Sequence, residues 1–140
     1  MDLTIPTEDT FYIVATDSTA DDVTRVLKDG ETFAVFDRQG DIQSGGLGQE
    51  GLYHEGTRFL SRLLFKLNNA RPFLLNSSVK EDNLVFVVNL TNPDVYRAGQ
   101  IVLPRGTLNI TRTKLLREGT CYENLRFINY RLAPVEVHFS

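Results

Sequence analysis

The feature that most constrains the fold is a pair of long alternating stretches in the last third of the sequence. The first runs from Thr107 to Leu116, and one parity of it holds Leu108, Ile110, Arg112 and Lys114. The second runs from Tyr122 to Leu132, with Glu118-Gly119 between the two. Alternation with a period of two is typical of a β-strand, and a short turn containing glycine joins antiparallel neighbours. The sequence therefore predicts a long β-hairpin.

Shorter apolar or alternating stretches, each bounded by turn residues, predict further strands. They cover residues 11–15, 23–27, 32–36, 59–67, 73–79, 84–90 and 135–139. The leucines of residues 59–67 also fit the spacing of an amphipathic helix, which stays open as an alternative. Residues 42–51 hold four glycines and predict a loop.

The segment before Asp29-Gly30 has two interpretations. Residues 23–27 and 32–36 flank this Asp-Gly pair, which is a strong hairpin signal because both central residues of a type I′ turn need a positive φ. The alternative is a short helix over residues 21–28, capped by Asp21 or Asp22 and ended by Gly30. We favour the hairpin.

Many short strands separated by turns predict an all-β fold, an antiparallel β-sandwich that is either complete or part of a larger super-sandwich. A mass of 15.8 kDa suits one domain. We expect residues 1–21 to be a polar lead-in with the first strand, and residues 22–140 to form the sandwich. Because the sequence stops at Ser140 within a strand pattern, we expect a fragment of a longer protein. Its truncated last strand would favour a homodimer formed through edge strands.

Charge and composition exclude several classes of partner. Residues 1–60 carry 12 acidic and 4 basic residues, whereas residues 61–140 carry 6 acidic and 11 basic residues. The bases are scattered without a Lys/Arg run, so we expect them on a solvated sheet face or opposite an acidic neighbour, with no nucleic-acid partner. The apolar runs are too short to span a bilayer, so we expect no membrane partner. A single cysteine, Cys121, and no secretory leader pattern lead us to expect a cytoplasmic location.

A polar cluster precedes the stretch at residues 59–67. It contains Tyr53, His54, Glu55, Thr57 and Arg58, and Arg62 follows it. One interpretation is a loop in which Arg58 and His54 bond backbone carbonyls and brace the strands. The other is that these six residues contact a sugar or a partner protein. Tyrosines can also stack on sugars, and the candidates are Tyr53, Tyr96, Tyr122 and Tyr130.

No complete catalytic apparatus is present in the sequence. A metal site needs three or four ligands, and besides His54 only His138 and Cys121 offer nitrogen or sulfur, so we expect no metal. The nucleophile motif G-x-S-x-G is absent. Glu55 could form a carboxylate pair with Glu81, Glu118 or Glu123, but nothing singles out one pair. We therefore expect no catalytic residue and no cofactor.

Four segments together resemble the N-terminal domain of bacterial glycogen-debranching-enzyme-like proteins, the amylo-α-1,6-glucosidase family. They are FAVFDRQGDI (33–42), GLYHEGTRFLSR (51–62), LLNSSV (74–79) and NLTNPD (89–94). The similarity extends over nearly the whole chain from about Asp22. His54, Thr57 and Arg58 match the family motif, although Glu55-Gly56 stands where relatives often have Arg-Asp.

The resemblance implies a β-sandwich placed before an (α/α)₆-barrel glycosidase domain that carries the catalytic acids. We therefore expect a non-catalytic accessory domain that packs on this C-terminal glycosidase domain and helps to shape its substrate cleft. One alternative is a free-standing module that binds α-glucan through residues 45–58. Another is a structural domain that oligomerises through its edge strands.

Overall fold

We describe the fold from a computed structural model, in which residues 24–43 and 49–140 are described. This part of the chain forms ten β-strands and no helix. The strands are β1 (Thr24–Asp29), β2 (Thr32–Asp37), β3 (Gly51–His54), β4 (Thr57–Leu60), β5 (Phe73–Lys80), β6 (Val85–Thr91), β7 (Val95–Arg97), β8 (Gln100–Leu103), β9 (Leu108–Arg117) and β10 (Thr120–Asn129). The strand expected at residues 11–15 and the boundary expected at residues 21–22 lie outside the described residues.

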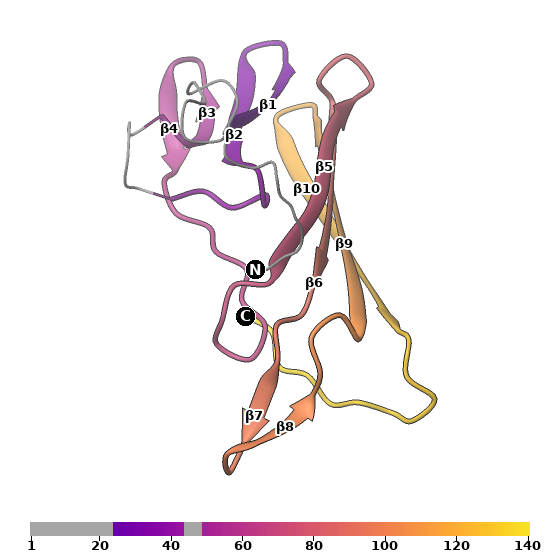
Figure 1. Cartoon of the computed structure of the whole chain (residues 1–140). Helices are drawn as coiled ribbons and strands as arrows, with labels where there is room; N and C mark the ends of the chain where they lie inside the picture. Colours follow the sequence, from indigo (N-terminus) through magenta and orange to yellow (C-terminus); the bar gives the residue numbers. More distant parts are fainter. Residues whose placement is uncertain (1–23, 44–48) are drawn as a thin grey trace, which may run out of the picture.

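The strands form two four-stranded antiparallel sheets, as the sequence predicted. The first sheet has the order β1-β2-β3-β4, and the second has the order β10-β9-β6-β5. Figure 1 shows the first sheet beside the upper half of the second. The hairpin β7-β8 forms a separate two-stranded sheet that projects from the lower end of the second sheet. The all-β antiparallel sandwich is therefore confirmed.

The core lies between the two sheets because the strands alternate between buried and more exposed residues. In β2 and β6 every second residue is buried, which places Ala34, Phe36, Phe86 and Val88 in the interior. The ring centroids of Phe36 and Phe86 lie 5.8 Å apart, so these two rings join the sheets directly. Full burial of each of these phenylalanine and valine side chains stabilises the fold by about 1.5–3 kcal/mol.

Two hairpins that the sequence predicted are confirmed. In the β1-β2 hairpin Asp29 pairs with Thr32, so Gly30 and Glu31 form the turn and the helix alternative for this segment is wrong. In the β9-β10 hairpin Arg117 pairs with Thr120, and both turn residues have positive φ, 51° for Glu118 and 76° for Gly119. Two successive positive φ values are those of a type I′ turn, which matches the right-handed twist of the strands.

The stretch from residue 53 to residue 67 differs from its prediction. The polar cluster is a hairpin, β3-β4, and not a loop. The strand expected at residues 59–67 continues only to Leu60, where β4 ends; beyond it Leu63 and Leu67 make isolated bridges. The helix alternative is also wrong. The chain must leave the first sheet after β4 and enter the second at β5, so this segment cannot stay in one ladder.

Two further strand predictions were incomplete. The hairpin β7-β8 falls in residues 95–103, where no strand was predicted. The strand expected at residues 135–139 is reduced to one bridge between Phe139 and Leu67, with hydrogen bonds from the backbone of residues 138–140 to residues 66–68. Its partner turns sharply at Asn68 and Asn69, both at positive φ, so the pairing cannot extend.

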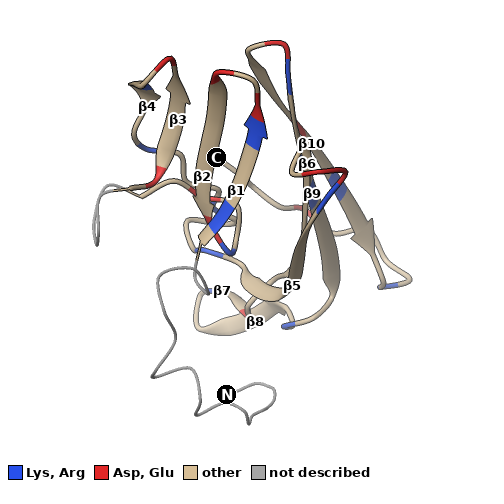
Figure 2. Cartoon of the chain, turned by 90° about the horizontal axis from the view of Figure 1, so that it is seen from above, with Lys and Arg blue, Asp and Glu red and all other residues tan. Residues whose placement is uncertain are grey.

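The acidic residues of the sheets gather at the turns. Figure 2 shows red segments where the hairpins β1-β2, β3-β4, β5-β6 and β9-β10 turn, and these contain Glu31, Glu55, Glu81 and Glu118. Two of the basic residues, Arg112 and Lys114, lie in the interior instead, where each is 1% exposed.

Candidate functional site

The six residues predicted to bind a sugar or partner lie in and just after the β3-β4 hairpin, but on different faces. Tyr53 pairs with Arg58 across the hairpin, and His54 pairs with Thr57. Successive strand residues point to opposite faces of a sheet, so these two pairs face opposite ways. Glu55 occupies the turn with φ of 49°. The polar cluster of the sequence therefore does not form a single site.

On one face of the hairpin, Tyr53 is held between an aromatic ring and a cation. Its ring stacks on Phe33 with the centroids 4.6 Å apart and the planes 10° from parallel. The guanidinium carbon of Arg58 lies 5.6 Å from the Tyr53 centroid, and Arg58 Nε donates to the Tyr53 hydroxyl at 3.2 Å. The Tyr53 hydroxyl donates in turn to the Gln49 carbonyl at 2.9 Å. Tyr53 and Arg58 therefore contact each other within the β3-β4 hairpin, and Tyr53 also contacts Phe33 on β2 and the Gln49 carbonyl.

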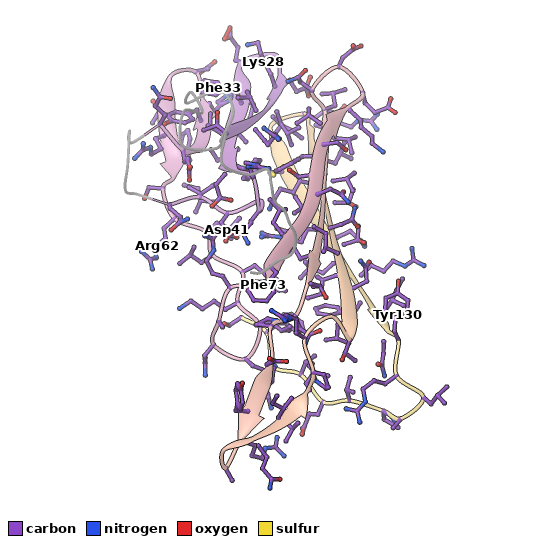
Figure 3. The ribbon with its side chains drawn as sticks, in the orientation of Figure 1. Lys28, Phe33, Asp41, Arg62, Phe73 and Tyr130 are labelled. Atoms are coloured by element: carbon purple, nitrogen blue, oxygen red, sulfur yellow. The ribbon has the colours of Figure 1, made fainter. Side chains whose placement is uncertain are left out.

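On the other face, His54 contacts the adjacent strand. Its Nδ1 lies 2.8 Å from the Thr32 hydroxyl, which is itself buried. Glu55 contributes its backbone, because its N–H donates to the Glu31 carbonyl at 2.9 Å. Arg62 follows β4 and points away from the molecule in Figure 3. The structure therefore brings Tyr53 together with Arg58, and His54 with Thr32, while Arg62 stands apart.

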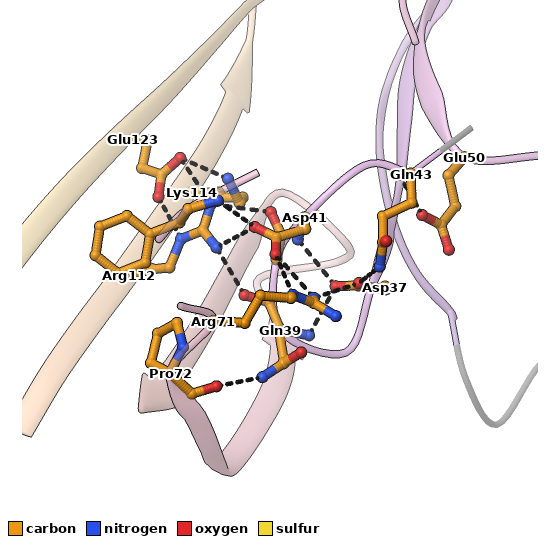
Figure 4. A network of polar contacts seen from close by, with 12 residues as sticks. Asp37, Gln39, Asp41, Gln43, Glu50, Arg71, Pro72, Arg112, Lys114 and Glu123 are labelled. Atoms are coloured by element: carbon orange, nitrogen blue, oxygen red, sulfur yellow. Dashed lines mark hydrogen bonds and ion pairs between the residues drawn. The ribbon is translucent and has the colours of Figure 1, made fainter. Parts of the chain in front are cut away.

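The most densely connected polar group of the structure is an ion-pair network between the sheets, which sequence reasoning missed (Figure 4). At its centre Arg112 Nη1 donates to Asp41 Oδ1 at 2.7 Å, and each side chain is 2% exposed. Arg112 also donates to the carbonyls of Gln39 and Gly40, at 2.9 and 3.1 Å. The turn that follows β2 is thus fastened to the middle of β9.

A second carboxylate, Glu123, completes the pairing inside the second sheet. It accepts from Arg112 Nε and from Lys114 Nζ, each at 2.6 Å. Burial alone would raise the pKa of Glu123, but the hydrogen bond from Arg112 and the charges of both cations outweigh it and lower the pKa. Burial, followed by the like charge of Arg112, lowers the pKa of Lys114. The Lys114 ammonium also lies 4.7 Å from the centroid of Phe36.

The network extends toward the surface through Arg71. This side chain donates to Asp41 Oδ2 from Nε at 3.0 Å and from Nη2 at 2.8 Å, and to Asp37 Oδ2 at 2.8 Å. Asp37 Oδ1 accepts the backbone N–H groups of Gln39 and Asp41, both at 2.9 Å, which fixes the turn. Asp41 Oδ1 also accepts the Phe65 N–H at 3.0 Å. One turn therefore orders the connection between the sheets.

Of the two places expected for the basic residues, a solvated sheet face or a position opposite an acidic neighbour, Arg112 and Lys114 occupy the second, because both are buried and paired with carboxylates. Both residues share their parity in β9 with Leu108, Ile110 and Leu116, and that parity is buried throughout. The opposite parity, rich in threonine and asparagine, is the half-buried outer face. The feature of the sequence that could have predicted the burial of Arg112 and Lys114 is the parity that they share with these apolar residues.

The network is built from paired charges. Each of its carboxylates, on Asp37, Asp41 and Glu123, accepts hydrogen bonds from a cation. Within residues 24–43 and 49–140, no group of three or more His, Cys, Asp or Glu side chains is placed to hold a metal ion. In the same residues, no helix is long and apolar enough to cross a membrane. The network therefore has a structural role, because its ion pairs join the two sheets.

Comparison with known proteins identifies the family. A family model described as the N-terminal domain of some glycogen debranching enzymes matches residues 27–140, from within β1 to the end of the chain. No curated protein and no solved structure matches the chain. The match covers more than half of the sequence and confirms the resemblance carried by the four motif segments. The chain therefore belongs to the family of N-terminal domains of glycogen debranching enzymes.

Proposed function

We propose that this chain is a non-catalytic accessory domain of a debranching-type α-glucan hydrolase, and that it packs on the (α/α)₆ catalytic barrel of its parent protein. The observation that carries the proposal is the family match over residues 27–140, because an N-terminal domain implies a parent chain with further domains. The proposal assigns glucan cleavage to the parent's barrel and positioning to this domain.

An exposed apolar surface supports a docking role. It consists of Val102, Tyr130 and Leu132, which are 41%, 66% and 108% exposed. The two segments are neighbours, since Arg131 Nη1 donates to the Val102 carbonyl at 3.2 Å. Clustered apolar side chains in water are typical of interaction sites. We call this the β8 surface and assign it to the contact with the barrel.

The test is association between this chain and the separately expressed catalytic region of the same parent protein, measured by calorimetry. We expect binding that weakens about tenfold or more in Leu132→Asp, because a buried charge would replace an apolar contact. The matched control is Phe59→Asp, since Phe59 is 69% exposed but lies on β4 in the first sheet, away from the β8 surface. Equal effects of the two substitutions, or no association of the wild type, would contradict the proposal.

A second measurement addresses catalysis. The 140-residue chain alone should release no glucose from a branched dextrin, whereas the parent's catalytic region should. Turnover by the chain that disappears in Glu55→Ala would overturn the non-catalytic assignment.

A further inference from the structure

A pocket of about 340 Å³ lies beside the β7-β8 hairpin and adjoins the β8 surface. Its walls are β7, the preceding Pro93-Asp94 segment, Val102 of β8, the turn at residues 67–70 and His138. Its volume falls in the range of small-molecule sites in proteins, about 300–1,000 Å³. None of the six residues predicted to bind a sugar lines it, so it is a separate candidate.

The turn that forms one wall is held firmly in place. Leu67 and Ala70 exchange backbone hydrogen bonds of 2.7 and 3.1 Å, which close the turn over Asn68 and Asn69. The Asn68 N–H donates to the His138 carbonyl at 2.6 Å, and the His138 N–H donates to Asn68 Oδ1 at 3.2 Å. These reciprocal bonds fix the backbone of His138 beside the turn.

The opposite wall is anchored by the fully buried Asn92. Its Nδ2 donates to the carbonyls of Pro93 and Pro104 at 2.7 and 2.9 Å, and its Oδ1 accepts the Leu108 N–H at 2.8 Å. Asp94 Oδ1 accepts the Arg105 N–H at 2.7 Å. Both walls are therefore set before any ligand enters, which reduces the entropy lost on binding.

Several polar groups on these walls are free to bind a ligand. Among the described residues, no hydrogen bond or ion pair engages the side chains of Asn69, Arg97 or His138. The Nδ2 of Asn68 is buried without a partner in the same part of the chain, so this wall is incompletely satisfied. Amide, imidazole and guanidinium groups supply donors, and amide and carboxylate oxygens supply acceptors.

The pocket combines these groups with an aromatic ring and balanced charge. Tyr96 lines it and is 62% exposed, which leaves its ring available for stacking. Arg97 contributes one positive charge and Asp94 one negative charge. This balance disfavours a phosphate or another strong anion. A neutral pyranose fits better, because it presents an apolar face of C–H groups to a ring and a rim of hydroxyls to polar side chains.

We infer that this pocket binds a glucosyl unit of an α-glucan, with Tyr96 stacking on the sugar ring and Arg97, His138 and Asn69 bonding its hydroxyls. The neutral-sugar class rests on the pocket itself, whereas the choice of an α-glucan rests on the function proposed above. A glucan held here would lie beside the β8 surface, close to the domain assigned to cleave it.

The test is a titration of the isotope-labelled 140-residue chain with maltotriose, followed by amide chemical shifts. We expect saturable shifts at residues 68–70, 94–97 and 138, with a dissociation constant of about 1–10 mM. Tyr96→Ala and Arg97→Ala should each weaken binding about tenfold. The matched control is Tyr122→Ala, since Tyr122 is 55% exposed on β10 and lies outside the pocket; it should bind as the wild type does.

Three outcomes would overturn the inference. They are the absence of saturable shifts at the pocket, shifts confined to the β3-β4 hairpin, and binding of inorganic phosphate at the pocket in preference to maltotriose. Spectra of the free variants establish that they remain folded. Because association with the catalytic region is measured separately, failure of the sugar site leaves the docking proposal standing, and failure of docking leaves the sugar site standing.

Discussion

Arg112 and Asp41 form a buried ion pair that joins the two sheets, with Nη1 and Oδ1 2.7 Å apart. The two residues are 71 positions apart in the sequence and each side chain is 2% exposed. Removing one partner of a buried ion pair leaves an uncompensated charge, which costs more than the pair contributes when intact. This pair therefore makes the fold sensitive to single substitutions at either position.

Asp41→Asn should destabilise the domain by about 3–5 kcal/mol, because Arg112 and Arg71 then lose a charged acceptor inside the protein. The measurement is urea unfolding followed by circular dichroism. Asp82→Asn makes the same chemical change in the exposed β5-β6 turn and should alter stability by less than about 0.5 kcal/mol.

The coupling between the pair is tested by a double variant. The loss of stability in Asp41→Asn combined with Arg112→Gln should be clearly smaller than the sum of the two single losses, because the second substitution removes the charge that the first left unpaired. Strictly additive losses would show that the pair is not a coupled unit.

The position of Gly40 explains why the turn above Arg112 needs glycine. Its φ is +88°, and a Cβ there would lie 3.1 Å from Lys114 Cε and 3.3 Å from both Arg112 Cζ and Val88 Cγ2. Gly40→Ala should therefore combine backbone strain with displacement of the buried cations. Gly56 has a similar φ of +81° with nothing within 4 Å of the added atom, so Gly56→Ala measures the strain alone.

We expect Gly56→Ala to cost about 1–2 kcal/mol and Gly40→Ala to cost about 1–3 kcal/mol more. Thermal unfolding of both variants against the wild type gives the comparison. Equal losses of stability in the two variants would mean that the buried network accommodates the added methyl group at residue 40 with no loss of stability beyond the backbone strain.

Local patterns in the sequence were sufficient to predict the regular hairpins. The parity of Leu108 and Ile110 and the positive-φ signal at Gly30 and Gly119 act within a few residues, so β1-β2 and β9-β10 could be predicted. The hairpin β7-β8 was missed because its strands have only three and four residues, too short for periodicity to appear.

The interior network could not be predicted because its stability depends on distant partners. Arg112 shares a buried parity with leucines, and its burial is compensated by Glu123 on the neighbouring strand and by Asp41, 71 positions away on the turn after β2. The candidate binding cluster at residues 53–58 was contiguous in sequence, yet strand alternation separates Tyr53 from His54. The pocket at β7 gathers residues 68–70, 94–97 and 138, which no local motif connects.

The lowered pKa of Glu123 predicts a dependence of stability on acid. Its folded-state pKa lies below the ordinary value of 4.5, so the carboxylate stabilises the fold above that value and loses this contribution as pH falls through the folded pKa. Glu123→Gln should therefore be less stable than the wild type at neutral pH, and the difference should shrink below pH 4.5.

The measurement for Glu123 is the urea midpoint over a series of pH values. Glu136→Gln is the control, since Glu136 is exposed and its curve should follow the wild type at every pH. A constant offset between Glu123→Gln and the wild type down to the most acidic pH would contradict the assignment.

The contacts of Tyr53 distinguish a bracing role from a binding role for the β3-β4 hairpin. Tyr53→Ala removes the stack on Phe33 and the contact with Arg58, so it should lower stability by about 1–3 kcal/mol. If the hairpin braces the sheet and the sugar site lies at β7, the same variant should bind maltotriose as tightly as the wild type. Tyr96→Ala should show the reverse, weaker binding with little change in stability, because that ring is 62% exposed. If the Tyr53→Ala variant kept its stability but lost sugar binding, the sugar site would have to be assigned to the β3-β4 hairpin.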